Sequence, residues 1–293
     1  MRQGLTAGNS RAAAGLLCGV MTKGWVLVAA LAAFPVAAAA AGDPHPVRAR
    51  LVADVSQPSP GQSLHAGVLL SIEDGWHVYW KNPGDAGLAT EVRITLPQGV
   101  EAGPVRWPAP HRFTQPGGLA GYGYEGSLLL ASEVRMGGGP PAGGSRVTAE
   151  ASWLACKDIC LLGSARLDEP WPLPATGREF EVWRAALPAG DPPFEVSVTG
   201  GLAPGARRAD IALWLSWPQP PGEVELFPET GGRLKVGSPR VQTRGSLTRV
   251  DLELTVVGAP DVPVERLAAV VAARAGGSPR QAWEIVIPLN GTS

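Results

Sequence analysis

Short apolar stretches alternate with turn residues from residue 47 almost to the C-terminus. Within several of them apolar and polar residues alternate, which is typical of strands with one buried face. We predict a first series of strands at residues 47–55, 63–72, 76–80, 91–96, 105–107, 127–134, 146–155 and 165–173. A second series is predicted at residues 194–198, 211–217, 224–227, 241–243, 247–257, 267–273 and 282–289. Strands at this spacing predict β-sandwiches.

One segment, residues 177–187, has helical periodicity instead, with Phe180, Trp183 and Leu187 on one face. A Pro- and Gly-rich linker follows it. We therefore predict an all-β protein in which a β-sandwich over residues 43–175 is followed by a helix and linker over 176–193. A second β-sandwich-like domain, without cysteine or histidine, is predicted over 194–293. The 29 prolines and 38 glycines are spread between the strands, which favours turns over disorder.

The N-terminus has the pattern of an export signal. Lys23 precedes an apolar run that ends in the small residues 37–41, so we predict a signal peptide over residues 1–41, with Met21 as an alternative start. The apolar run is short and Pro35 interrupts it, which disfavours a membrane anchor. We expect a soluble, exported product with no stable membrane insertion. The net charge of −1 does not indicate nucleic acid as a partner.

Three cysteines occur in the chain, and Cys18 falls within the predicted signal, which leaves Cys156 and Cys160. Such a pair in an exported protein is a structural disulfide, a redox centre or part of a metal site. In a continuous strand the two Cα atoms would lie about 13 Å apart, whereas a disulfide requires about 7 Å or less. If the pair is bonded, residues 157–159 must therefore form a tight turn or one helical turn at the end of a strand.

A structural role for this pair is disfavoured by its short spacing. The chain-entropy estimate gives only about 2 kcal/mol for so small a loop, and small local disulfides are often exchangeable. Lys157 favours a thiolate nearby and Asp158 opposes it. The metal hypothesis lacks further ligands close in sequence. The residues thus favour a redox-active pair over a structural bridge or a metal site, and all three remain open.

Two other features predict little chemistry. Residues 121–126 match GxGxxG by letter, but a strand follows them and no βαβ pattern surrounds them, so we predict a flexible aromatic loop rather than a nucleotide site. His65, His77 and His111 are expected to be at the surface or hydrogen-bonded.

Four motifs in order resemble one known family. They are the segments 76–87 (WHVYWKNPGDAG), 107–110 (WPAP), 121–124 (GYGY) and 156–160 (CKDIC). Together they are similar to the N-terminal periplasmic region of thiol:disulfide interchange proteins of the DsbD type, with the copper-sensitivity-suppressor (ScsB) branch most alike. The similarity covers residues 45–175.

This resemblance implies an immunoglobulin-like domain in which Cys156 and Cys160 are the redox pair and no cofactor is needed. It also implies a cap that shields the pair, for which Phe113, Tyr122 and Tyr124 are candidates by position, and an acidic neighbour, for which Asp85 is the candidate. The implied partners are periplasmic thiol or disulfide proteins. Family members continue into a membrane domain and a thioredoxin-like domain, and this chain stops at Ser293, so we expect the membrane electron donor to be a separate protein.

The leading hypothesis is therefore periplasmic thiol:disulfide interchange, as part of a protein-disulfide reductase system. The alternatives are a non-enzymatic β-sandwich binding module with a structural disulfide, and a copper-tolerance accessory protein in which reduced Cys156 and Cys160 bind copper.

Overall fold

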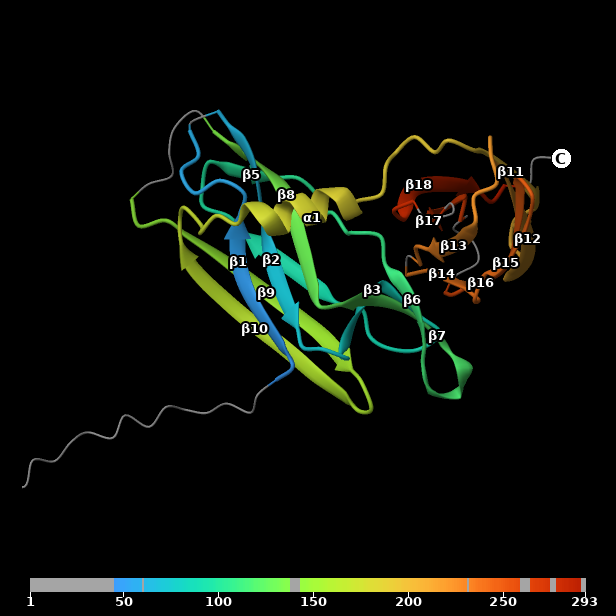
Figure 1. Cartoon of the computed structure of the whole chain (residues 1–293), viewed down its shortest axis with the longest axis horizontal. Helices are drawn as coiled ribbons and strands as arrows, with labels where there is room; N and C mark the ends of the chain where they lie inside the picture. The colour runs from blue at the N-terminus through green and yellow to red at the C-terminus, as the bar shows by residue number, and fades with distance from the viewer. Residues whose placement is uncertain are drawn as a thin grey trace, which may run out of the picture. The chain divides into compact units, whose positions relative to one another are not determined.

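The computed structural model describes residues 45–290 apart from residues 60, 138–142, 231, 259–263 and 275–277. The predicted signal peptide lies outside the described residues. Residues 42–293 form one compact unit, and β-strands dominate its described part (Figure 1). The all-β prediction is confirmed, whereas the division into two domains stays a prediction.

The first half of the chain forms two sheets. Its elements are β1 (Val47–Ala53), β2 (Ser63–Ile72), β3 (His77–Gly84), β4 (Glu91–Thr95), β5 (Val100–Ala102), β6 (His111–Thr114), the short 3-10 turn η1 (Pro116–Gly118), β7 (Ala120–Glu125), β8 (Ser127–Met136), β9 (Arg146–Cys156) and β10 (Cys160–Pro170). One sheet has the order β1-β2-β8-β5, and the other has the order β10-β9-β3-β7-β6 with β4 paired to β9. Alternate residues of both sheets meet in one core, which includes Val68, Leu130, Trp80 and Trp153. This is the arrangement of a sandwich.

The helix α1 (Gly177–Ala186) covers the outer face of the first sheet and lies across β8 (Figure 1). Phe180 and Trp183 are buried there against Val52, Leu69 and Leu129. Leu187 packs at the edge of the same cluster. The predicted helix and its apolar face are confirmed.

The second half of the chain forms another pair of sheets. Its strands are β11 (Glu195–Gly200), β12 (Arg208–Ser216), β13 (Glu223–Pro228), β14 (Leu234–Val236), β15 (Arg240–Arg244), β16 (Leu247–Val256), β17 (Arg266–Arg274) and β18 (Gln281–Pro288). The sheet β11-β12-β16-β14, to which β15 adds through β16, packs on the sheet β13-β17-β18 around a separate core. The ring of Phe227 from this half contacts Trp80 and Tyr122 of the first half.

Two sequence predictions in the first half are wrong. Residues 121–126, expected as a flexible loop, belong largely to strand β7, because the glycines at 121 and 123 face one side while the tyrosines between them face the core. Residues 105–107 do not form a strand of their own, since only Arg106 makes an isolated bridge, to Ala131 of β8. Strand β3 continues to Gly84, beyond the strand predicted at residues 76–80.

Candidate functional site at a disulfide-closed hairpin

Strands β9 and β10 form a long antiparallel hairpin whose tip carries both cysteines. Cys156 ends β9, Cys160 begins β10, and the two residues lie directly opposite each other in the register. They form a disulfide with a Cα–Cα distance of 4.1 Å. Residues 157–159 turn the chain, and the Lys157 N–H donates a hydrogen bond to the Ile159 carbonyl at 3.0 Å. The tight turn expected from the sequence is therefore present, rather than a helical turn.

The disulfide lies on the face of its sheet that points away from the sandwich core. Along β9, Trp153 and Ala155 face the core, so Cys156 faces outward. The same alternation on β3 sends Val78 and Trp80 into the core and leaves His77 and Tyr79 on the side of Cys156. The site is therefore built from side chains of β3, β9 and β10 on one outer face.

The two sulfur-bearing residues differ sharply in exposure. Cys156 is only 3% exposed, whereas Cys160 is exposed together with residues 157–159 of the turn. Ile159 next to Cys160 is 62% exposed, and the Lys157 ammonium reaches back to the Asp74 carbonyl at 3.4 Å. Because thiol exchange requires direct access to a sulfur atom, an incoming protein meets Cys160 first.

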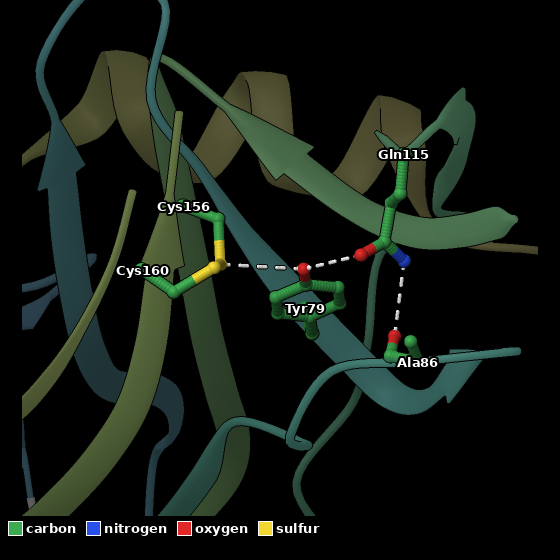
Figure 2. The surroundings of a disulfide bond; sticks show 5 residues. All are labelled: Tyr79, Ala86, Gln115, Cys156 and Cys160. Atoms are coloured by element: carbon green, nitrogen blue, oxygen red, sulfur yellow. Dashed lines mark hydrogen bonds between the residues drawn. A yellow bond between two sulfur atoms is a disulfide. The ribbon is translucent and has the colours of Figure 1, made fainter. Parts of the chain in front are cut away.

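The buried sulfur is held by a tyrosine hydroxyl. The Tyr79 O–H lies 3.4 Å from the Cys156 Sγ and 3.0 Å from the Gln115 Oε1, and the Gln115 Nε2 donates to the Ala86 carbonyl at 3.0 Å (Figure 2). One hydroxyl hydrogen serves two acceptors here, and a disulfide sulfur is the weaker of them. A thiolate at Cys156 would be a much stronger acceptor. Burial raises the pKa of Tyr79, which keeps its hydroxyl protonated and able to donate.

An aromatic ring and two glycines shape the space around Tyr79. Phe113 of β6 packs against His77 and Tyr79, with ring centroids 4.0 and 5.7 Å away. Gly121 lies opposite Phe113 in the register of β6 and β7, and a Cβ added there would come within 2.2 Å of the Phe113 ring. A Cβ at Gly87 would come within 2.4 Å of the Tyr79 ring. A larger residue at Gly121 would displace the ring of Phe113, and one at Gly87 would displace the ring of Tyr79, which contacts Cys156.

His77 differs from the hydrogen-bonded or surface histidine expected from the sequence. It is half-buried, and its Nε2 is buried without a hydrogen-bond partner in the described part of the chain. Burial lowers its pKa, against an opposing effect of the Glu125 carboxylate. His65, in contrast, follows the expectation, because its Nδ1 pairs with Asp54 at 2.9 Å.

The predicted neighbours of the pair are only partly brought together. Phe113 lies on the disulfide side of the sheet, as expected for a cap. Tyr122 and Tyr124 do not, because both face the sandwich core and are 3% and 5% exposed. The Asp85 carboxylate accepts hydrogen bonds from the Ala120 N–H and the Ser238 hydroxyl, so it is engaged away from the sulfurs.

Three residues of this site, His77, Tyr79 and Gln115, were not predicted from the sequence to lie beside the pair; His77 was expected only to be at the surface or hydrogen-bonded. The alternation along the strand could have placed His77 and Tyr79 together, because residues two apart lie on the same face and Trp80 lies on the other face. Gln115 carries no such signal.

No group of three or more His, Cys, Asp or Glu side chains suited to a metal ion occurs within the described ranges. Of the helices in the part of the chain that the structure describes, none has the length and apolar character needed to span a membrane.

Comparisons with known proteins agree with this geometry. Residues 44–171 match the family model described as "Thiol:disulfide interchange protein DsbD, N-terminal". The crystal structure of the N-terminal periplasmic domain of ScsB from Proteus mirabilis superposes with a TM-score of 0.61 at 17% identity, covering 83% of this chain and 94% of that one.

Two further structures match only weakly. A marsupial T cell receptor gives a TM-score of 0.22 at 12% identity, covering 81% of this chain and 100% of that one. The Enterococcus faecalis MSCRAMM ACE gives a TM-score of 0.20 at 10% identity, covering 81% of this chain and 92% of that one. The search among curated proteins finds no match.

The family match and the hairpin disulfide agree with each other, and the ScsB likeness agrees with the sandwich of the first half. Residues 44–171 therefore form an immunoglobulin-like domain that is similar to the DsbD N-terminal domain and carries a Cys156–Cys160 disulfide.

Proposed function

We propose that this protein exchanges thiols and disulfides with partner proteins through Cys156 and Cys160. The observation that carries the proposal is the asymmetry of the bond: one sulfur-bearing residue is exposed at a hairpin tip, and the other is 3% exposed behind it. A structural bridge has no need of an exposed sulfur, whereas exchange requires one sulfur for the partner and a second one close by to release it.

The exposed position gives each cysteine a role. In the reduced protein the Cys160 thiolate attacks one sulfur of a partner disulfide, which forms a mixed disulfide and releases the other partner sulfur as a thiolate. Cys156 then attacks the Cys160 Sγ, restores the Cys156–Cys160 bond and frees the second partner thiolate. Two electrons pass to the partner, which also takes up two protons. The same steps in reverse reduce this protein.

Tyr79 and Gln115 support the buried half of this reaction. When Cys156 is a thiolate, the Tyr79 hydroxyl hydrogen is expected to turn from Gln115 to the sulfur, because the charged acceptor forms the stronger bond. Phe113 shields the same atoms from water, which strengthens that bond.

The setting proposed for this exchange is the periplasm, after export by the N-terminal signal. There the domain passes reducing equivalents between a separate membrane electron donor and oxidised periplasmic proteins. This setting rests on the signal-like pattern of residues 1–41 and on the similarity to a periplasmic domain of ScsB.

A redox titration of the full chain tests the proposal. Carrying Cys18→Ser, the protein is equilibrated in glutathione buffers, and the state of Cys156 and Cys160 is measured by thiol trapping and mass spectrometry. A midpoint between about −120 and −270 mV, the range of exchange proteins, is expected. A midpoint below about −300 mV is typical of structural bridges and would overturn the proposal.

The roles of the two sulfurs are tested with single-cysteine variants. Cys156→Ser keeps the exposed sulfur and is expected to accumulate a mixed disulfide with an oxidised model substrate such as glutathione disulfide. The matched variant Cys160→Ser keeps only the buried sulfur and is expected to accumulate the mixed disulfide much more slowly. Equal rates would refute the assigned order of attack.

A further inference from the structure

His77 is the cross-strand neighbour of the buried cysteine. The two residues are paired in the register of β3 and β9, on the same outer face of the sheet. Directly opposed residues of antiparallel strands have Cβ atoms only about 4.5–5.5 Å apart. The imidazole is also fixed on its other sides, because its ring contacts Tyr79 at 5.3 Å and Phe113 at 4.0 Å. It therefore stays beside Cys156.

The imidazole has an unused nitrogen in this position. Its Nε2 is buried and has no hydrogen-bond partner in the described residues. A buried polar atom without a partner is rare, because it loses the free energy of a hydrogen bond to water. The cross-strand neighbour of His77 is one half of a redox pair, so a partner absent from the oxidised state can be present in the reduced state. The thiol of reduced Cys156 is such a partner, since it carries a hydrogen that the disulfide lacks.

Cys156 also requires a proton acceptor. A free thiol has a pKa of about 8.5, and an apolar surrounding raises it. Only the thiolate attacks a disulfide, so the buried Cys156 must lose its proton before it can act. Tyr79 can donate a hydrogen bond to the sulfur but cannot accept the proton at neutral pH, because it is itself protonated.

The charges around His77 suit this role. Glu125 of β7 is its register partner on the opposite side, and its carboxylate stabilises an imidazolium at this position. On its own strand Tyr79 is neutral, and Phe113 of β6 carries no charge. The Lys157 ammonium of the turn is directed to the Asp74 carbonyl. Burial lowers the pKa of His77, so the imidazole is neutral near pH 7 and can accept a proton.

We propose that the His77 Nε2 accepts the proton of the Cys156 thiol in the step that closes the disulfide. The Cys156 S–H bond breaks and its proton passes to His77. The resulting thiolate attacks the Cys160 Sγ of the mixed disulfide. The Cys156–Cys160 bond forms, the bond from Cys160 to the partner sulfur breaks, and the departing partner thiolate takes up a proton. In the opposite direction the His77 imidazolium returns its proton to the Cys156 thiolate.

This inference rests on the exchange function proposed above, and one assay separates the two. The reduced full chain with Cys18→Ser is mixed with 5,5′-dithiobis(2-nitrobenzoate), and the release of thionitrobenzoate is followed by stopped-flow absorbance. The first phase reports attack by the exposed Cys160, and the second reports closure by Cys156. If no second release occurs, the pair does not act as an exchange centre and the proposed function fails. If both phases occur, the assay tests His77.

The His77→Gln variant keeps a polar side chain of similar size but cannot take up a proton. Its first phase is expected to match that of the parent, while its second phase at about pH 7 is about tenfold slower or more, as for loss of a general base. Toward about pH 9.5 the two proteins are expected to converge, because the thiol then ionises without help. In the matched control His111→Gln, on strand β6 at the edge of the same sheet, both phases should stay unchanged.

Two results would overturn the inference. One is a second phase in His77→Gln with the rate and pH profile of the parent. The other is an equal slowing at every pH, which would indicate a merely structural effect. If His77→Gln does not fold, the unaltered protein is tested instead by ¹³C-histidine NMR. The His77 titration should differ between the reduced and the oxidised protein, and an identical titration in both states contradicts the proposal.

Discussion

Removal of one hydroxyl group tests the chemistry assigned to Tyr79. In Tyr79→Phe the ring keeps its packing against Phe113 and His77, but the donor 3.4 Å from the Cys156 Sγ is lost. A hydrogen bond to a charged group contributes about 1.5–3 kcal/mol, and the bond that the hydroxyl otherwise keeps with Gln115 about 1 kcal/mol. The thiolate therefore loses about 0.5–2 kcal/mol more than the thiol. At 1.36 kcal/mol per unit, the pKa of Cys156 is expected to rise by about one unit.

The measurement uses Cys156 as the single thiol. In the Cys18→Ser, Cys160→Ser background, the rate of alkylation by iodoacetamide is recorded as a function of pH, with and without Tyr79→Phe. The control Tyr122→Phe removes a hydroxyl from a buried tyrosine on the other face of the sheet and should leave the pKa of Cys156 unchanged. An unchanged or lower pKa in Tyr79→Phe would refute the assigned role.

Gln115 provides a test of opposite sign. In Gln115→Met the Tyr79 hydroxyl loses the acceptor at 3.0 Å that competes with the sulfur. When Cys156 is a thiol, this removes the hydrogen bond from Tyr79 to Gln115. When Cys156 is a thiolate, that bond is already absent, because Tyr79 donates to the sulfur instead. Only the thiol form is therefore destabilised, and the pKa of Cys156 is expected to fall by up to about 0.7 units. A rise in both variants would show that only the packing around the sulfur matters.

Three further predictions follow from the packing and the titration of the domain. Gly121→Ala should destabilise the fold by about 1–3 kcal/mol and speed reduction of the disulfide by dithiothreitol, because the added Cβ overlaps the Phe113 ring. The control is Gly177→Ala, whose Cβ meets no atom within 4 Å. Equal urea midpoints for the two variants would contradict the prediction. Phe180→Ala should cost about 3–5 kcal/mol in urea unfolding, whereas Val182→Ala on the 61% exposed side of α1 should cost less than about 0.5. Burial lowers the pKa of His77, so the neutral imidazole contributes to stability above about pH 6.5, and this contribution is lost as the pH falls through the folded-state pKa. His77→Gln should therefore lose less stability than the parent on acidification. An unchanged pH dependence of stability would argue against the lowered pKa.

The sequence predicted those parts of the site that depend on local geometry. If Cys156 and Cys160 are bonded, their spacing requires a tight turn or one helical turn, and the apolar alternation before them predicts a strand. The turn at the end of β9 therefore follows from covalent reach, whereas the start of β10 at Cys160 was not predicted. The face of α1 followed in the same way from Phe180, Trp183 and Leu187. These features need no knowledge of distant residues.

The other parts of the site depend on contacts between distant segments. Gln115 reaches Tyr79 across 36 positions of the chain, and no periodic pattern signals a polar side chain in an irregular segment. The error at Tyr122 and Tyr124 has a different cause. Their alternation with glycine was interpreted as flexibility, although alternate small residues also mark a strand face against which other side chains pack closely.

The long hairpin separates the chemistry of the pair from the folding of the domain. Eleven residues of β9 are paired with eleven of β10, and the disulfide joins only the last pair at the tip. Cleavage of that bond leaves the ladder and the core beneath it in place, and by loop size the bond contributes only about 2 kcal/mol to stability. In the proposed exchange, the domain would therefore pass from the oxidised to the reduced state and back with no refolding between the two.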